Sequence, residues 1–139
     1  MKYRILILIC LSIGNYCWSQ ETDTIKIDKA FYLSDFSVSI INLISSPDKY
    51  HNQRIRVIGY LNLEFEGNSI YLHKEDFKKS IYANGLWVDF TKEAWAKIEK
   101  YNINKCYVII EGTFDKIDRG HMGLWSGTIK DITRIDKWN

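Results

Sequence analysis

The sequence predicts a mainly β domain, namely a five-stranded Greek-key barrel with a helix between its third and fourth strands and an extra helix in front of the first. Three observations predict this fold. Apolar and polar residues alternate through 54–66, apolar strand-like segments recur at 85–90, 106–115 and 124–135, and glycines interrupt the first and fourth strands. Alternation of period two is typical of a strand that buries one face. A glycine in mid-strand permits the bend that a small closed sheet needs.

Residues 1–19 have the layout of a secretory signal peptide. Lys2 and Arg4 make a positive start, residues 5–13 are apolar, and the small residues Cys17 and Ser19 precede a predicted cut before Gln20. The apolar run is far shorter than the roughly 20 residues that a membrane span requires. We therefore expect an exported protein, periplasmic or secreted, with no transmembrane segment in its mature chain. Residues 20–36 are predicted to be a lead-in, and residues 37–139 the domain.

The composition is that of one globular domain and gives no support for a nucleic-acid partner. Of 139 residues, 46% are hydrophobic and 26% charged, which excludes a disordered chain. Removal of the leader, with Lys2 and Arg4, leaves 17 basic against 17 acidic residues, so the mature chain exerts no general attraction on phosphate backbones. The mature chain keeps one cysteine, Cys106, and cannot form an internal disulfide. Cys106 lies in an apolar run, where we expect it to pack as a small hydrophobe rather than to act as a nucleophile.

The first helix is predicted to begin at Ser37, whose hydroxyl can cap its free amide groups. Its apolar residues fall at helical spacing on one face, and they are Ile40, Ile41, Leu43 and Ile44. Pro47 either closes this helix or opens a last turn that ends near Tyr50 and His51.

The first strand is predicted over 54–66, because its alternation is the strongest pattern in the chain. The apolar face comprises Ile55, Val57, Leu61, Leu63 and Phe65, whereas Tyr60 and Asn62 belong to the opposite, polar face. Gly59 falls on the buried face, where it predicts a bend or a close backbone approach. A tight turn at 66–68 leads into a second strand over 69–73, and the two form a hairpin.

The remaining elements follow from similar signals. Residues 74–82 are polar and predict a loop with a helical turn, and 85–90 are the third strand. Thr91 can cap a helix that runs to about Tyr101, with Ala94, Ile98 and either Tyr101 or Trp95 facing inward. The fourth strand, 106–115, contains Gly112 in its middle, and a charged turn at 116–123 follows. The alternation of the fifth strand, 124–135, slips at 130–131, which predicts a bulge.

Three strands, a helix and two strands are the element order of the OB-fold. Another small barrel or an α+β sandwich is the alternative. The stretch from Pro47 through Tyr50 to Arg54 and Gly59 resembles the opening of small extracytoplasmic OB-fold proteins of bacteria. The segments 64–67, 111–114 and 120–123 are also similar to those of an uncharacterised group among them. The resemblance covers roughly residues 37–135. It implies the fold and carries no established activity.

The turn between the fourth and fifth strands contains the candidate ligand-binding residues Arg119, His121 and Met122. In an OB-fold this turn and the faces of strands two and three border the binding groove, so Tyr71, His73 and Trp87 are predicted to form its floor. A histidine and a flexible methionine at a groove can contact a ligand. The alternative is a hairpin turn in which Gly120 and Gly123 take positive φ and Met122 packs back onto the barrel.

The sequence favours a non-catalytic binding module of the cell envelope, which recognises a peptide, a glycan or another envelope protein. We predict no catalytic residue, no cofactor and no metal site, because the three histidines lack ligand spacing and no nucleophile motif is present. The alternative is a small extracytoplasmic hydrolase whose site is assembled from scattered acidic and histidine residues. The chain offers many carboxylates for it, including Glu64, Glu66, Glu75, Asp76 and Asp89.

Overall fold

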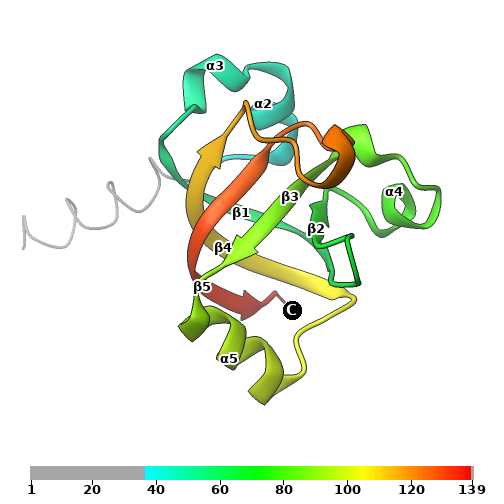
Figure 1. Ribbon diagram of the computed structural model, residues 1–139, viewed down its shortest axis with the longest axis vertical. Coiled ribbons are helices and arrows are strands. Elements are labelled where there is room, and N and C mark those ends of the chain that lie inside the picture. The colour runs from blue at the N-terminus through cyan, green and yellow to red at the C-terminus, as the bar shows by residue number, and fades with distance from the viewer. Residues whose placement is uncertain (1–36, 139) are drawn as a thin grey trace, which may run out of the picture.

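The computed structural model describes residues 37–138, which form a closed barrel of five strands in the order β1-β2-β3-β5-β4 (Figure 1). The strands are β1 (Arg54–Asn62), β2 (Ser69–Tyr71), β3 (Gly85–Phe90), β4 (Cys106–Asp115) and β5 (Thr128–Lys137). The helices are α2 (Ile40–Ser45), α3 (Pro47–Tyr50), α4 (Lys74–Lys78) and α5 (Lys92–Tyr101), with single 3-10 turns at Tyr82–Asn84 and His121–Gly123. The mainly β, OB-fold-like barrel predicted from the sequence is confirmed, including the helix between β3 and β4.

The parallel pairing of β3 with β5 closes the barrel, and all other neighbouring strands are antiparallel. The interior is filled by alternate residues of every strand, among them Ile55, Ile70, Leu86, Ile110 and Ile129. Helices cover the two ends: α2 buries Ile40 and Leu43 at one end, and α5 buries Ala94 and Ile98 at the other (Figure 1). No helix within 37–138 is both long and apolar enough to cross a membrane. The predicted leader at 1–19 and lead-in at 20–36 lie outside the described residues.

Gly59 and Gly112 both lie where the backbone of another segment approaches closely. A Cβ atom on Gly59 would stand 2.6 Å from the carbonyl oxygen of Tyr71 and 2.8 Å from Cδ1 of Ile40. One on Gly112 would stand 2.7 Å from the carbonyl oxygen of Lys130, beside the register shift between β4 and β5. The predicted bulge at 130–131 is confirmed, because Asp131 has a φ of +51° within that shift.

The first strand ends earlier than predicted. β1 stops at Asn62, and Phe65, predicted to be buried, is 91% exposed. The side-chain amide of Asn104 accepts from the N–H of Leu63 at 2.8 Å and donates to its carbonyl at 2.9 Å, which takes both backbone groups out of the sheet. Glu66 then turns the chain with a φ of +56°.

Tyr60 and Asn62, predicted on the polar face, are instead fully covered. Tyr60 packs against Phe77 of the α4 helix and Tyr107 of β4, with ring centroids 6.1 and 5.6 Å apart. The outer surface of the barrel therefore carries an aromatic cluster in this region. The alternation within β1 does not predict that its outer face is buried, because the residues that cover this face come from other segments.

The helices differ from the prediction in detail. Ser39 caps α2, not Ser37, because its hydroxyl accepts from the N–H of Asn42. Val38 donates its N–H to the carbonyl of Arg56, so Ser37 is extended and pairs with β1 instead of starting the helix. Ile41 points outward, at 56% exposure. In α5, Thr91 is the cap as predicted, but neither Trp95 nor Tyr101 is buried, and Ile103 covers that end of the core instead.

Three further strand limits were predicted wrongly, and one of them is the end of β5, which lies at Lys137 and not at Ile135. β2 stops at Tyr71 because Asp76 accepts the N–H of His73 at 3.1 Å and starts α4. β5 begins at Thr128 rather than Leu124, and the chain before it stays beside β3, where Ser126 donates its N–H to the carbonyl of Gly85. Trp125, one residue earlier, is buried outside the barrel core.

Candidate functional site

The loop between β4 and β5 contains three of the six predicted ligand-binding residues, and hydrogen bonds of Asp115 and Arg119 join its two ends. Asp115 accepts from the backbone N–H groups of Ile117 and Asp118 and from Nζ of Lys130. The side-chain hydrogen bond from Lys130, followed by that from the Ile117 N–H, lowers the pKa of Asp115 to about 2. Arg119 donates from Nε to the carbonyl of Trp125 at 2.7 Å, so its guanidinium group links two positions of the same loop.

The loop tip exposes two of the predicted residues. Met122 has a φ of +55° and is 81% exposed, so it does not pack back onto the barrel, although Gly120 and Gly123 have the positive φ values that a turn of this kind requires. Nε2 of His121 lies 3.5 Å from Oε2 of Glu66. The β4–β5 loop therefore meets the β1–β2 turn at this point.

Trp125 covers the predicted groove floor. Tyr71 is buried, and its hydroxyl accepts a hydrogen bond from Nε1 of Trp125 at 3.3 Å. Burial is the largest influence on this hydroxyl and raises its pKa. The ring of Trp87 lies 5.0 Å from that of Trp125, nearly edge-on, and its Nε1 donates to Asp89. Gly120 packs directly on Trp87, since a Cβ there would stand 2.7 Å from the indole ring.

His73 is not part of this aromatic cluster, because it is the residue at the start of α4. It is exposed and contributes its backbone N–H to Asp76. The structure thus brings Tyr71 and Trp87 together beneath Trp125, whose backbone carbonyl binds Arg119. His121 and Met122 lie at the exposed tip of the β4–β5 loop. No local sequence pattern marks Trp125 as the residue that fills the groove.

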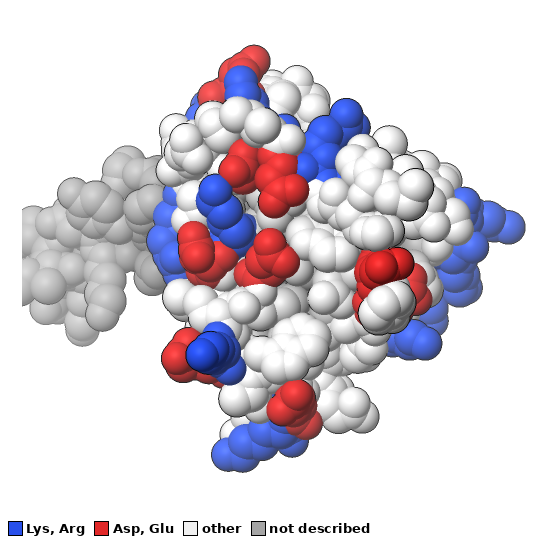
Figure 2. Space-filling model, viewed as in Figure 1, with Lys and Arg blue, Asp and Glu red and all other residues white. Residues whose placement is uncertain are grey.

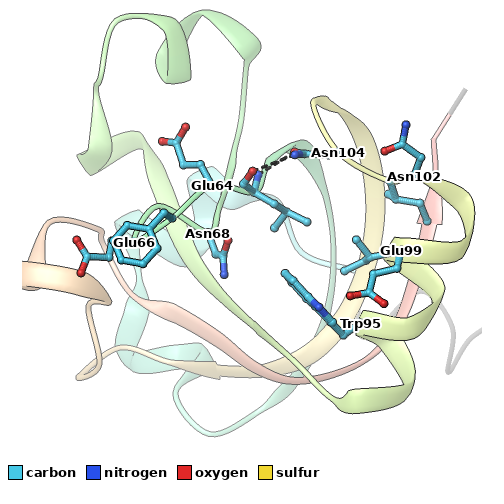
Figure 3. A pocket seen from close by; sticks show the side chains of 11 residues that line it. Glu64, Glu66, Asn68, Trp95, Glu99, Asn102 and Asn104 are labelled. Atoms are coloured by element: carbon cyan, nitrogen blue, oxygen red, sulfur yellow. Dashed lines mark hydrogen bonds between the residues drawn. The ribbon is translucent and has the colours of Figure 1, made fainter.

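A cleft of about 580 Å³ lies on the other side of the β1–β2 turn, between this turn and α5 (Figure 3). Its size is within the usual range of ligand sites. The cleft is lined by five apolar, three acidic and three amide side chains: Leu63, Phe65, Trp95, Ile98 and Ile103; Glu64, Glu66 and Glu99; Asn68, Asn102 and Asn104. None of the six predicted ligand-binding residues is among them.

Asn104 holds the two walls of the cleft together. It lies just beyond α5 and binds both backbone groups of Leu63, which begins the β1–β2 turn (Figure 3). Its Oδ1 also accepts from the N–H of Lys105 at 2.7 Å. Ile98 and Ile103 are buried beside it and belong to the barrel core. The base of the cleft is therefore part of the packed core, whereas Phe65 and Trp95 at its rim are exposed.

The cleft is acidic. Glu64 and Glu66 project from the turn and Glu99 from α5 (Figure 3), and no lysine or arginine is among the lining residues. Within residues 37–138, the ion-pair contact of these carboxylates is the one between Glu66 and His121. Glu64 and Glu66 were recognised in the sequence as two of many carboxylates. Glu99 lines the same cleft only because distant segments of the chain come together in the fold.

Cys106 and His51, the other potentially reactive side chains, contribute to packing and to loop hydrogen bonds. Cys106 is partly buried against the core. His51 accepts the N–H of Lys116 through Nδ1 and lies 3.6 Å from Asp115, at the start of the β4–β5 loop. Among residues 37–138, no group of three or more histidine, cysteine, aspartate or glutamate side chains is arranged to hold a metal ion.

Comparison of the chain with protein-family models finds no match, and comparison with curated proteins finds no significant one.

Proposed function

We propose that this protein is an exported, non-catalytic binding module of the cell envelope and that it holds its ligand in the cleft between the β1–β2 turn and α5. The single observation that carries the proposal is the mixed chemistry of that cleft: a fixed apolar base, exposed aromatic rings at the rim, and carboxylate and amide groups around them. Apolar surface with a few polar groups is the usual make-up of a ligand site.

The packing of Trp125 supports this choice of surface. The strand face that OB-folds commonly use is here filled by the indole ring and its hydrogen bond to Tyr71. A ligand at that face would have to displace a buried tryptophan, whereas the cleft is open to solvent. Phe65, at 91% exposure, is the most exposed apolar side chain at its rim.

The export part of the proposal is supported by residues 1–19, with their positive start, short apolar run and small residues before Gln20. Intact-mass measurement of the protein recovered from the exported fraction tests it. We expect the mass of a chain that begins at Gln20. Recovery with Met1 still attached contradicts export with cleavage.

Binding at the cleft is tested by calorimetric titration with two probe sets, acetylated dipeptide amides and chitooligosaccharides. The test variant carries Phe65→Ala and Trp95→Ala, and the control is Trp138→Ala, which removes an exposed ring outside the cleft. We expect at least one probe to bind, to lose about tenfold or more in affinity in the test variant, and to keep its affinity in the control.

The same samples distinguish binding from catalysis. After prolonged incubation, mass spectrometry of the bound probe should return it unchanged. Cleaved probe would favour the alternative function, a small hydrolase that uses the carboxylates of Glu64, Glu66 and Glu99 as acid and base. Equal affinity in the test and control variants would contradict the assignment to this cleft.

A further inference from the structure

The apolar part of the cleft needs a partner with an apolar side chain. Leu63, Ile98 and Ile103 form its base, and the rings of Phe65 and Trp95 stand at opposite rims. Trp95 is supported from behind by Phe90, with ring centroids 5.9 Å apart, so its free face is held toward the space between the walls (Figure 3). A side chain inserted between these rings would remove apolar surface of both partners from water.

The charged part of the cleft needs a cation. Glu64, Glu66 and Glu99 are among the lining residues, and no lysine or arginine is. The carboxylate of Glu66 is turned toward His121 of the β4–β5 loop, so Glu64 and Glu99 are the two lining carboxylates without an ion-pair contact among residues 37–138. Glu99 lies in the last turn of α5, where a negative charge is unfavourable beside the carbonyl end of the helix. Figure 2 shows uncharged surface in the middle of this face of the molecule with charged side chains around it.

Concave apolar walls strengthen the field of the carboxylates beside them, because water does not fully screen it. A guanidinium group fits the arrangement especially well: it forms paired hydrogen bonds with carboxylates and stacks on an indole ring. Asn68 projects into the space between the walls (Figure 3) and offers both amide donors and an acceptor, which suits the N–H and C=O groups of a peptide backbone.

We propose that the cleft binds a peptide segment of a partner protein in which an arginine or lysine adjoins an aromatic or large apolar residue. This inference rests on the proposed function and names the ligand class of the same site. The apolar residue packs over Leu63 and between Phe65 and Trp95. The cation lies beside the carboxylate of Glu99, and Glu64 adds negative charge from the facing turn.

The test compares two matched probes in calorimetric titration: acetyl-phenylalanyl-arginine amide and the same dipeptide with citrulline, a neutral analogue of arginine with nearly the same shape. Agmatine, a free guanidinium compound, is the third probe. The cleft variant carries Glu64→Gln and Glu99→Gln. The control carries Glu75→Gln and Glu93→Gln, two exposed carboxylates that do not line the cleft, so both variants lose the same net charge.

We expect the arginine probe to bind about fivefold or more tightly than the citrulline probe, a preference in the range of two partly exposed charge contacts. The preference should disappear in the cleft variant and persist in the control. A rise in salt from about 50 to about 500 mM should weaken arginine binding and leave citrulline binding nearly unchanged.

Each alternative result contradicts a different claim. Equal affinity for the two dipeptides, with loss of both in the Phe65→Ala and Trp95→Ala variant, overturns the cationic ligand and leaves the binding cleft intact. Agmatine binding as tight as that of the dipeptide overturns the peptide and identifies a small cation. Dipeptide binding that is unchanged in every cleft variant overturns this inference and the proposed function together.

Discussion

The indole Nε1 of Trp125 donates a hydrogen bond to the hydroxyl of Tyr71 at 3.3 Å, and this contact fastens the β4–β5 loop to the outer face of β2. The ring also packs edge-on against Trp87 and Tyr82, with centroids 5.0 and 5.3 Å away. One side chain thereby joins three segments that are far apart in sequence. The strand face that would otherwise be open becomes a second, smaller core.

Replacement of Trp125 tests how much this second core contributes to stability. We expect Trp125→Ala to lower the free energy of unfolding by about 3–5 kcal/mol, because a large buried ring is removed. Trp125→Phe keeps much of the apolar contact and loses the hydrogen bond, so a loss of about 1–2 kcal/mol is expected. Urea unfolding monitored by circular dichroism gives both values. A loss below about 1 kcal/mol for Trp125→Ala would show that the loop does not depend on this ring.

Gly59 tests the tight closure of the barrel. A valine side chain there would clash with the carbonyl oxygen of Tyr71, which belongs to the backbone, and with Ile70 and Ile40. We expect Gly59→Val to destabilise by about 1–3 kcal/mol in thermal or urea unfolding. Gly123→Asn is the matched control: no atom lies within 4 Å of a Cβ there, and asparagine tolerates its φ of +69°. An unchanged thermal midpoint for Gly59→Val would contradict the close approach.

Asn62 is completely buried, and neither its amide nitrogen nor its amide oxygen has a hydrogen-bond partner among the described residues. A buried amide without partners is costly, so Asn62→Leu should leave stability unchanged or raise it, by up to about 1–2 kcal/mol. Chemical denaturation measures the difference. A loss of more than about 1 kcal/mol would mean that the amide of Asn62 is bonded in solution and contributes to the fold.

Asp115 makes a prediction about acid stability. Its pKa lies near 2 in the folded protein against an ordinary 3.8, since Lys130 and the Ile117 N–H stabilise the ionised form. A lowered folded-state pKa contributes stability above pH 3.8, and this contribution is lost as the pH falls toward 2. We expect Asp115→Asn to unfold more easily at neutral pH, by about 1–2 kcal/mol after allowance for solvent screening, and to show a shallower fall below pH about 4.

The control for this pH series is Glu93→Gln, which alters an exposed carboxylate on α5. Its acid unfolding should follow that of the unmodified protein. Parallel curves for the unmodified protein and Asp115→Asn between pH about 4 and about 2 would contradict the role assigned to this carboxylate.

Most of the barrel was predictable because its signals are local. The limits of β3 and β4 follow from apolar strand patterns, the start of α5 from the capping hydroxyl of Thr91, and the bulge at Asp131 from a slip in alternation. Errors arose where a distant side chain replaced a local partner. Phe65 is exposed because Asn104, 41 residues beyond Leu63, takes the backbone groups that would have continued β1.

The candidate site was much less accessible to sequence analysis. The alternation of β1 and β2 correctly predicted that Tyr71 lies on a strand, but not that Trp125 covers it. The walls of the cleft come from the β1–β2 turn and the end of α5. No sequence pattern in either segment predicts that the two lie side by side. Glu64 and Glu66 had no distinguishing feature among the many carboxylates until Glu99 and Trp95 were placed opposite them.

We propose that ligand enters the cleft beside α5 and not the strand face beneath Trp125. Two-dimensional NMR of isotopically labelled protein, titrated with acetyl-phenylalanyl-arginine amide, distinguishes the two surfaces. We expect shifts of the backbone amides of Leu63 and Glu66, the indole of Trp95 and the side-chain amide of Asn104, which line the cleft. Shifts concentrated instead on Tyr71, Trp87 and His121 would contradict it and would place the ligand in the groove beside the β4–β5 loop.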